Sequence, residues 1–264
     1  MGVKRLLHIF QKRFWMPHAR DVARSTVAQC VPCQLGKDYG PRKKFTGTTG
    51  ALKPWQIIAV DIMGPLPSSR SNEYIITFND CFTRFVIAIP SSNHRTSTIA
   101  QLMMTHVIAA YGVPEVVLSD RGTEFTSSLW RELSLIFGYK LMHTSPYHPS
   151  TNGICDCSHR TINNAVRAAL TQNPRLLWSD IVPSLQLTLN ASPCESNQFS
   201  PHQLLFGHPA RLPIQQHVAS PPDDITLSIP DADYVSSLRA AIETARLEAL
   251  KNTDIKPLPL TLTQ

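Results

Sequence analysis

The sequence predicts an α/β fold, a mixed sheet with helices on its faces, preceded by a basic helical segment. Three short apolar segments rich in β-branched residues come first, and further apolar segments then alternate with stretches of helical periodicity. That order is typical of a sheet covered by helices. Positive charge is concentrated ahead of it. Residues 1–53 carry 11 Lys/Arg against two Asp, a net charge of +9, whereas the remainder carries 14 basic and 17 acidic residues, a net charge of −3.

Five segments predict strands. The first, WQIIAVDIMG at 55–64, is a short apolar run that stops at a Gly-Pro turn signal. The second and third, at 72–80 and 83–90, are separated by only two residues, which predicts an antiparallel hairpin. Two more strands are predicted at 114–120 and 139–145. Together they make a mixed five-stranded sheet.

Helices are predicted between and after these strands. Residues 96–112 and 126–138 each begin with Thr or Ser and stop at a glycine. Residues 152–170 and 233–252 also have helical spacing. The last helix is amphipathic and is expected to form a packing or oligomer face. The residues expected on that face are Tyr234, Leu238, Ala241, Ile242, Ala245 and Ala249. Prolines at 193, 201, 209 and 213 are expected to interrupt the chain before it.

The basic segment at the amino terminus indicates the kind of partner. Residues 6–36 are helical in pattern, and residues 37–53 form a polar, Gly- and Lys-rich linker. Phosphate contacts supply most non-specific nucleic-acid affinity, so the charge favours a polyanion partner, with a solvated basic surface as the alternative. No apolar run reaches 18 residues, and no signal peptide pattern is present. No membrane partner and no secretion are therefore expected.

Three aspartates fall where a sheet would present them together. Asp61 lies near the end of the first strand, Asp120 at the end of the fourth, and Asp156 in the first turns of a helix. Converging carboxylates bind hard divalent cations, and a pair of such ions supports phosphoryl transfer. Each acid also has a structural alternative: Asp61 as a turn cap, Asp120 in the turn SDRG, and Asp156 at a helix amino terminus, where the macrodipole favours it.

These residues carry a family resemblance. The segments AVDIMGPLP, VVLSDRGTEFTS, TSPYHPSTNG and SPHQLLFGHPARLP, with CVPCQ before them, occur in the family's order. Over about residues 2–215 the chain resembles retroviral and, more closely, gypsy-type LTR-retrotransposon integrases. The resemblance implies an RNase H-like integrase catalytic core with acids Asp, Asp and Glu, the last two separated by 35 residues. Here 35 residues separate Asp120 from Asp156. Asp61 and Asp120 thus match the aspartates, and Asp156 occupies the glutamate's place.

Asp156 departs from the family pattern. It is one methylene shorter than Glu, so its carboxylate reaches less far toward bound metal, and a misplacement of ~1 Å can cost roughly 10²-fold in rate. Cys157 stands where the family has a basic residue, which weakens a contact to DNA phosphate. These changes favour impaired or lost catalysis. A new metal site made by Cys155, Cys157 and His159 is not expected, because the three do not share a helix face.

The resemblance also suggests DNA-contacting residues. His148, Asn152 and Gly153 match the loop before the catalytic helix, and Arg160 lies on that helix. A purely structural role is the alternative for the Asn and Gly, which punctuate loops for conformational reasons. Arg167 is expected to be solvated surface.

The amino-terminal segment resembles a truncated zinc module. Cys30 and Cys33 have the spacing of half a structural zinc site. The family completes it with two upstream histidines, which are expected to fall before residue 1. Two thiols alone hold Zn²⁺ poorly, so the site is expected to be incomplete, with completion by His8 or His18 as an alternative.

Four parts of the chain follow from the resemblance. They are a truncated zinc-binding (HHCC-type) segment at 1–36, a basic linker at 37–53, an RNase H-like catalytic core at 54–215, and a linker with a carboxy-terminal amphipathic helix at 216–264. The carboxy-terminal barrel or chromodomain of such integrases is not expected here.

The resemblance implies DNA integration by a homo-oligomer that uses Mg²⁺ or Mn²⁺ to process 3′ ends and to transfer strands. The protein is expected in the nucleus, or in the cytoplasm before import. An integrase-derived protein, domesticated or degenerate, that binds nucleic acid or protein without catalysis is the alternative. A ribonuclease H-type nuclease is disfavoured by the matched segments outside the acids.

Overall fold

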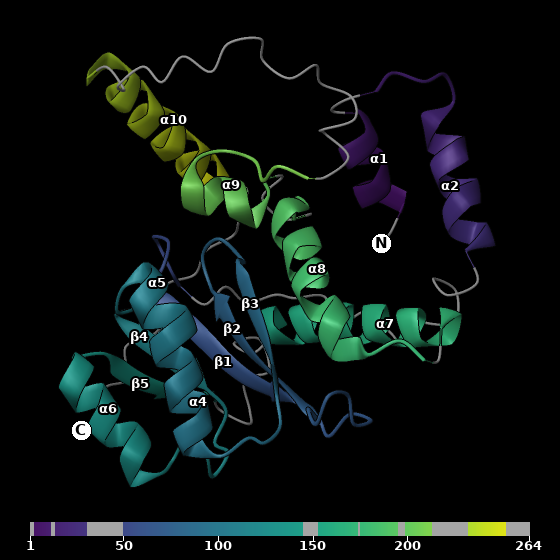
Figure 1. Ribbon diagram of the computed structural model, residues 1–264. Helices are drawn as coiled ribbons and strands as arrows, with labels where there is room; N and C mark the ends of the chain where they lie inside the picture. The colour runs from purple at the N-terminus through teal and green to yellow at the C-terminus, as the bar shows by residue number, and fades with distance from the viewer. Residues whose placement is uncertain are drawn as a thin grey trace.

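A computed structural model of the chain describes residues 3–11, 14–30, 50–144, 153–173, 175–194, 199–212 and 232–251. Its centre is a five-stranded sheet in the order β3-β2-β1-β4-β5, with helices on both faces (Figure 1). This confirms the predicted α/β class. Among the described residues, no helix is both long and apolar enough to cross a membrane.

All five predicted strands are present. They are β1 (Ile57–Met63), β2 (Tyr74–Asp80), β3 (Val86–Ser91), β4 (Val116–Ser119) and β5 (Lys140–His143). The predicted hairpin is confirmed, because β2 and β3 pair antiparallel. β1 also pairs antiparallel with β2, but parallel with β4, and β4 pairs parallel with β5. The central strand β1 thus joins the antiparallel half of the sheet to the parallel half.

One face of the sheet is covered by the helices that follow β3 and β4. The helix predicted at 96–112 is confirmed in outline, but it consists of α4 (Thr96–Met103), a π-helical stretch η1 (Met104–Ile108) and α5 (Ala109–Tyr111). The next helix, α6 (Ser128–Phe137), begins at Ser127, whose side chain accepts a hydrogen bond from the Trp130 amide. Trp130 is fully buried in the main core with Ile58 and Val60 of β1.

The opposite face is covered by α7 (Gly153–Gln172) and α8 (Trp178–Ala191). Figure 1 shows α7 behind the sheet and α4 and α6 in front of it. The α7 helix was predicted, whereas no helix was predicted for the α8 segment. The prediction that proline interrupts the chain at 201 agrees with a helix boundary there, because Pro201 is the first residue of α9 (Pro201–Phe206). Proline suits that position, since its missing amide would be unpaired there anyway.

The carboxy-terminal helix α10 (Ala232–Lys251) is confirmed and contacts α9. Its Ala249 is buried, and the Arg246 guanidinium donates to the Leu204 carbonyl (3.2 Å). Of the other residues on the predicted packing or oligomer face, Ile242 and Ala245 are half-buried and Ala241 is exposed. The predicted positions Tyr234 and Leu238 have side chains outside the described set.

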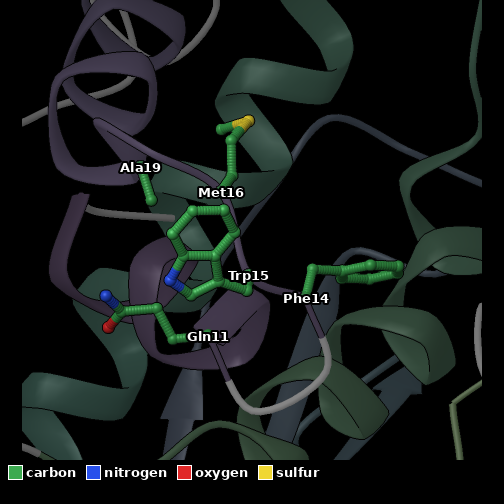
Figure 2. A pocket seen from close by; sticks show the side chains of 5 residues that line it. All are labelled: Gln11, Phe14, Trp15, Met16 and Ala19. Atoms are coloured by element: carbon green, nitrogen blue, oxygen red, sulfur yellow. The ribbon is translucent and has the colours of Figure 1, made fainter.

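The amino-terminal segment forms two helices, α1 (Val3–Gln11) and α2 (Ala19–Gln29), which contact each other. Figure 1 shows them to one side of the sheet. Figure 2 shows a hollow in their connection, around Trp15, whose side chain is 89% exposed. The lining residues are Gln11, Phe14, Trp15, Met16 and Ala19. All come from residues 11–19, so none of the three predicted catalytic acids lines this hollow.

Candidate active site at the sheet edge

Asp61 is positioned by the alternation of β1. Ile58 and Val60 belong to the core beneath α4 and α6, whereas Ala59 and Met63 belong to clusters on the other face. Successive side chains of a strand point to opposite faces, so Asp61 lies on the Ala59 and Met63 side, which α7 covers. It is half-buried, and its carboxylate accepts a hydrogen bond from the Ile62 amide (2.9 Å).

Asp120 lies level with Asp61 on the neighbouring parallel strand. The ladder between β1 and β4 pairs Ile57 with Val116 and Ala59 with Leu118. If this register is continued two residues beyond Ala59 and Leu118, it places Asp61 opposite Asp120. Neighbouring strands are ~4.8 Å apart, and residues in step on parallel strands share a face. The two carboxylates therefore occupy one edge of the sheet, at the carboxyl ends of β1 and β4.

The turn after β4 holds Asp120 in place. Its Oδ1 accepts a hydrogen bond from the Gly122 amide (2.9 Å), and its main-chain oxygen accepts from the Ser119 hydroxyl (3.0 Å). The His143 ring Nδ1 of β5 lies 3.0 Å from the same main-chain oxygen. The turn predicted for SDRG is therefore present. The turn uses the Oδ1 atom of Asp120, and Asp120 itself is exposed at the end of the strand.

The third acid, Asp156, lies in the first turns of α7, as predicted. Buried Ile162 and Val166 fix this helix in a cluster with Met63 of β1 and Ile75 of β2. A helix rises ~1.5 Å and turns ~100° per residue, so Asp156 is about 9 Å along the axis from Ile162 and ~120° around it. It therefore lies to one side of the stripe that packs on the sheet.

The side chains of Asp156, Cys155, Cys157 and Arg160 lie outside the described set. The meeting of Asp156 with the other two acids therefore stays a prediction. Gly153 is the first residue of α7.

Other predicted site residues also fall outside the described part of the chain. His148, Asn152 and Cys33 belong to 145–152 and 31–49. Cys30 follows α2 directly and is half-buried. Within the described residues, no group of three or more His, Cys, Asp or Glu is arranged to hold a metal ion. The incomplete zinc site thus stays a prediction.

Glu124 lies near Asp120, across Gly122, and pairs with His94; neither residue was predicted from the sequence. His94 Nδ1 and Glu124 Oε1 are 2.6 Å apart. Burial alone would raise the pKa of the Glu124 carboxyl. Hydrogen bonds from its own main-chain amide and from His94 outweigh burial, and the pKa lies below its ordinary value. The only sequence signal is that Glu124 follows Asp120 by four residues, because His94 is 30 residues away in sequence.

Comparison with known proteins finds a known domain over the residues of the sheet. Residues 51–149 match the integrase core domain, a stretch that includes Asp61 and Asp120 and ends before Asp156. The Pro-Pol polyprotein of simian foamy virus type 3 (strain LK3) is 29% identical over 202 residues, which are 76% of this chain and 17% of that protein. The Transposon Tf2-3 polyprotein of Schizosaccharomyces pombe (strain 972) is 24% identical over 221 residues, 81% of this chain and 16% of that protein. The chain therefore spans less than a fifth of the polyproteins it matches.

A solved structure supports the fold. The simian T-cell lymphotropic virus intasome, determined in complex with the PP2A regulatory subunit B56 gamma, matches with a TM-score of 0.53 at 18% identity. The match covers 80% of this chain and 73% of that chain. At this identity the likeness concerns the RNase H-like fold alone.

Proposed function

We propose that this chain, which carries the integrase core domain found in retroviral and retrotransposon polyproteins, performs metal-dependent polynucleotidyl transfer on DNA. The reactions would be processing of 3′ ends and transfer of those ends into target DNA. One observation carries the proposal: Asp61 and Asp120 lie level at the carboxyl ends of two neighbouring parallel strands of that domain.

The donor set at this edge fits a hard divalent cation. Two carboxylates supply oxygen ligands, and Mg²⁺ is commonly held by one or two carboxylates while water and phosphate complete its shell. Asp61 and Asp120 would hold the ion, with Asp156 as third ligand. When bound, Mg²⁺ or Mn²⁺ activates the attacking oxygen and stabilises the leaving one.

The chain's own residues hold the acidic side chains in position. The β1–β4 ladder sets the separation of the two aspartates, and the Gly122 amide orients the Asp120 carboxylate through its Oδ1. The α7 helix, whose Ile162 packs in one cluster with Met63 of β1, would bring Asp156 toward these two acids. Pre-set positions matter because a displacement of ~1 Å at a reacting group costs roughly 10²-fold in rate.

The remaining parts of the proposal concern partners. DNA would contact the basic amino-terminal segment, where Arg20 and Arg24 of α2 are exposed. His148, Asn152, Gly153 and Arg160 would contact DNA near the acids. The chain would act in the nucleus as a homo-oligomer. Its parts would be the amino-terminal segment, linker, core and carboxy-terminal helix at the bounds given above, with Cys30 and Cys33 as half of a Zn²⁺ site.

The test is a strand-transfer and disintegration assay in Mg²⁺ or Mn²⁺ on the whole chain, Asp156→Glu and Asp61→Asn. Activity of the whole chain that disappears in Asp61→Asn supports the proposal. Activity only in Asp156→Glu identifies the shortened acid as a lesion in an otherwise intact site. Inactivity of the chain and of Asp156→Glu, with DNA binding retained, would favour a non-catalytic DNA-binding protein instead.

A further inference from the structure

Glu124 is held beside the proposed active site by a residue from a distant part of the chain. His94 lies just before α4, and Glu124 lies in the turn between β4 and α6. Their side chains meet at 2.6 Å, and the Glu124 side chain is only 18% exposed. The ring of Tyr74 packs on the ring of His94, with centroids 4.7 Å apart. The Glu124 carboxylate is therefore clamped in one orientation.

The other oxygen of Glu124 approaches Asp120 across Gly122. A Cβ built on Gly122 would lie 2.7 Å from Glu124 Oε2 and 3.0 Å from Asp120 Oδ1. Both distances are measured from the same Cβ position, so Glu124 Oε2 and Asp120 Oδ1 are no more than about 5.7 Å apart. A side chain at 122 would displace one of them. Glycine at this position lets the two carboxylates approach each other.

The main-chain attachment of this turn does not need the Glu124 carboxylate, which is paired with His94. The turn is already attached to α4 by its main chain, because the Thr96 hydroxyl donates to the Glu124 carbonyl (3.0 Å). The Ser127 hydroxyl donates to the same carbonyl (3.2 Å). Placing a second carboxylate near Asp120 costs energy through repulsion of like charges. A divalent cation bound at the same edge would offset that cost.

We propose that Glu124, clamped by His94, is a positioning residue of the active site that raises its affinity for a divalent cation by acting through Asp120. This inference rests on the proposed function, since it takes the sheet edge to be the cation site. It also bears on the shortened third acid, because Glu124 supplies negative charge to a site in which Asp156 reaches less far.

The test measures Mn²⁺ binding to the whole chain by isothermal titration calorimetry, without DNA or turnover. Glu124→Gln removes the charge and keeps the side-chain size. We expect it to weaken Mn²⁺ binding about 10- to 100-fold, the range seen when residues that support metal ligands are changed. Glu124→Asp keeps the charge and should lose less. Glu132→Gln, at an exposed position of the adjacent α6, is the matched control and should stay within about twofold.

Two reference results separate the possible failures. Asp120→Asn should abolish Mn²⁺ binding. If it does, and Glu124→Gln binds Mn²⁺ as tightly as the unchanged chain, the role of Glu124 is refuted and the proposed function stands. If the unchanged chain binds no Mn²⁺, or Asp120→Asn binds it equally well, the proposed function fails and this inference fails with it. Thermal unfolding of each variant shows whether lost binding comes from lost folding. If Glu124→Gln is unfolded, the comparison of Glu124→Asp with Glu132→Gln decides, and equal affinity in those two would also refute the role.

Discussion

The two halves of the candidate site are positioned by different physical means. Asp61 and Asp120 belong to strands joined by a hydrogen-bonded ladder, so their relative height follows from main-chain register. Asp156 belongs to a helix attached through apolar side chains, chiefly Ile162 and Val166. A ladder permits no small adjustment, since a slip of one residue reverses every side chain. A packed helix can shift or rotate slightly as its contacts change.

This difference indicates where the site tolerates change. The strand half carries Asp61 and Asp120, which match the aspartates expected from the resemblance, and the proposed positioning residue Glu124. The helix half carries Asp156 and Cys157, where the resemblance leads us to expect Glu and a basic residue. Substitutions in the strand half should therefore abolish activity. Substitutions in the helix half should change activity gradually, and they can raise it or lower it.

The largest effect is expected in the strand half. Asp61→Asn and Asp120→Asn should each lower strand-transfer or disintegration activity beyond the roughly 10²-fold that a displacement of ~1 Å costs. Thermal unfolding should not shift downward, because neither carboxylate is fully buried. Glu73→Gln, at an exposed position before β2, is the control and should keep full activity. Retained activity in either Asp variant would exclude the strand half as the catalytic half.

A change beneath the helix half should act on stability. Ile162→Ala removes a side chain that is 1% exposed, and such truncations cost about 2–5 kcal/mol of unfolding free energy. Chemical denaturation measures the loss. Arg167→Ala, on the exposed face of the same helix, should stay within about 0.5 kcal/mol. Equal losses in the two variants would mean that α7 is not held through its apolar face.

Lengthening the third acid tests the helix half directly. Asp156→Glu restores one methylene and should raise strand-transfer activity, by up to ~10²-fold if the shortfall approaches 1 Å. Asp156→Asn is the matched control and should lower whatever activity exists. A fall in activity on Asp156→Glu would show that the site is shaped around the shorter acid.

The smallest effect concerns the helix that follows the Asp120 turn. Ser127→Ala removes the side chain that accepts from the Trp130 amide, and loss of such a cap costs about 1 kcal/mol. Denaturant unfolding measures it, with Ser128→Ala, one residue inside α6 and exposed, as the control. Mn²⁺ affinity should be unchanged in Ser128→Ala. Weaker binding in Ser127→Ala alone would mean that its hydroxyl also positions Glu124 through the Glu124 carbonyl.

Much of the strand half could be predicted from sequence, because its signals are local. Apolar runs such as IIAV predicted β1, and an aspartate at or near the end of each of two buried strands indicated a shared edge. The pairing of His94 with Glu124 could not be predicted, since no local pattern connects residues 30 positions apart. The α8 helix was missed because Pro183 lies inside it, and proline inside a helix normally argues against one. The π-helical stretch η1 was missed because nothing in MTHVI distinguishes it from an α-helix.

The most direct test of the account is anomalous X-ray diffraction from crystals of the chain soaked in Mn²⁺. We predict an anomalous peak within coordination distance of one carboxylate oxygen from Asp61 and one from Asp120, and no such peak in crystals of Asp120→Asn. A fully ordered sheet edge that shows no peak there, at Mn²⁺ concentrations that saturate binding in solution, would contradict the assignment of this edge as the metal-binding half of an integrase site.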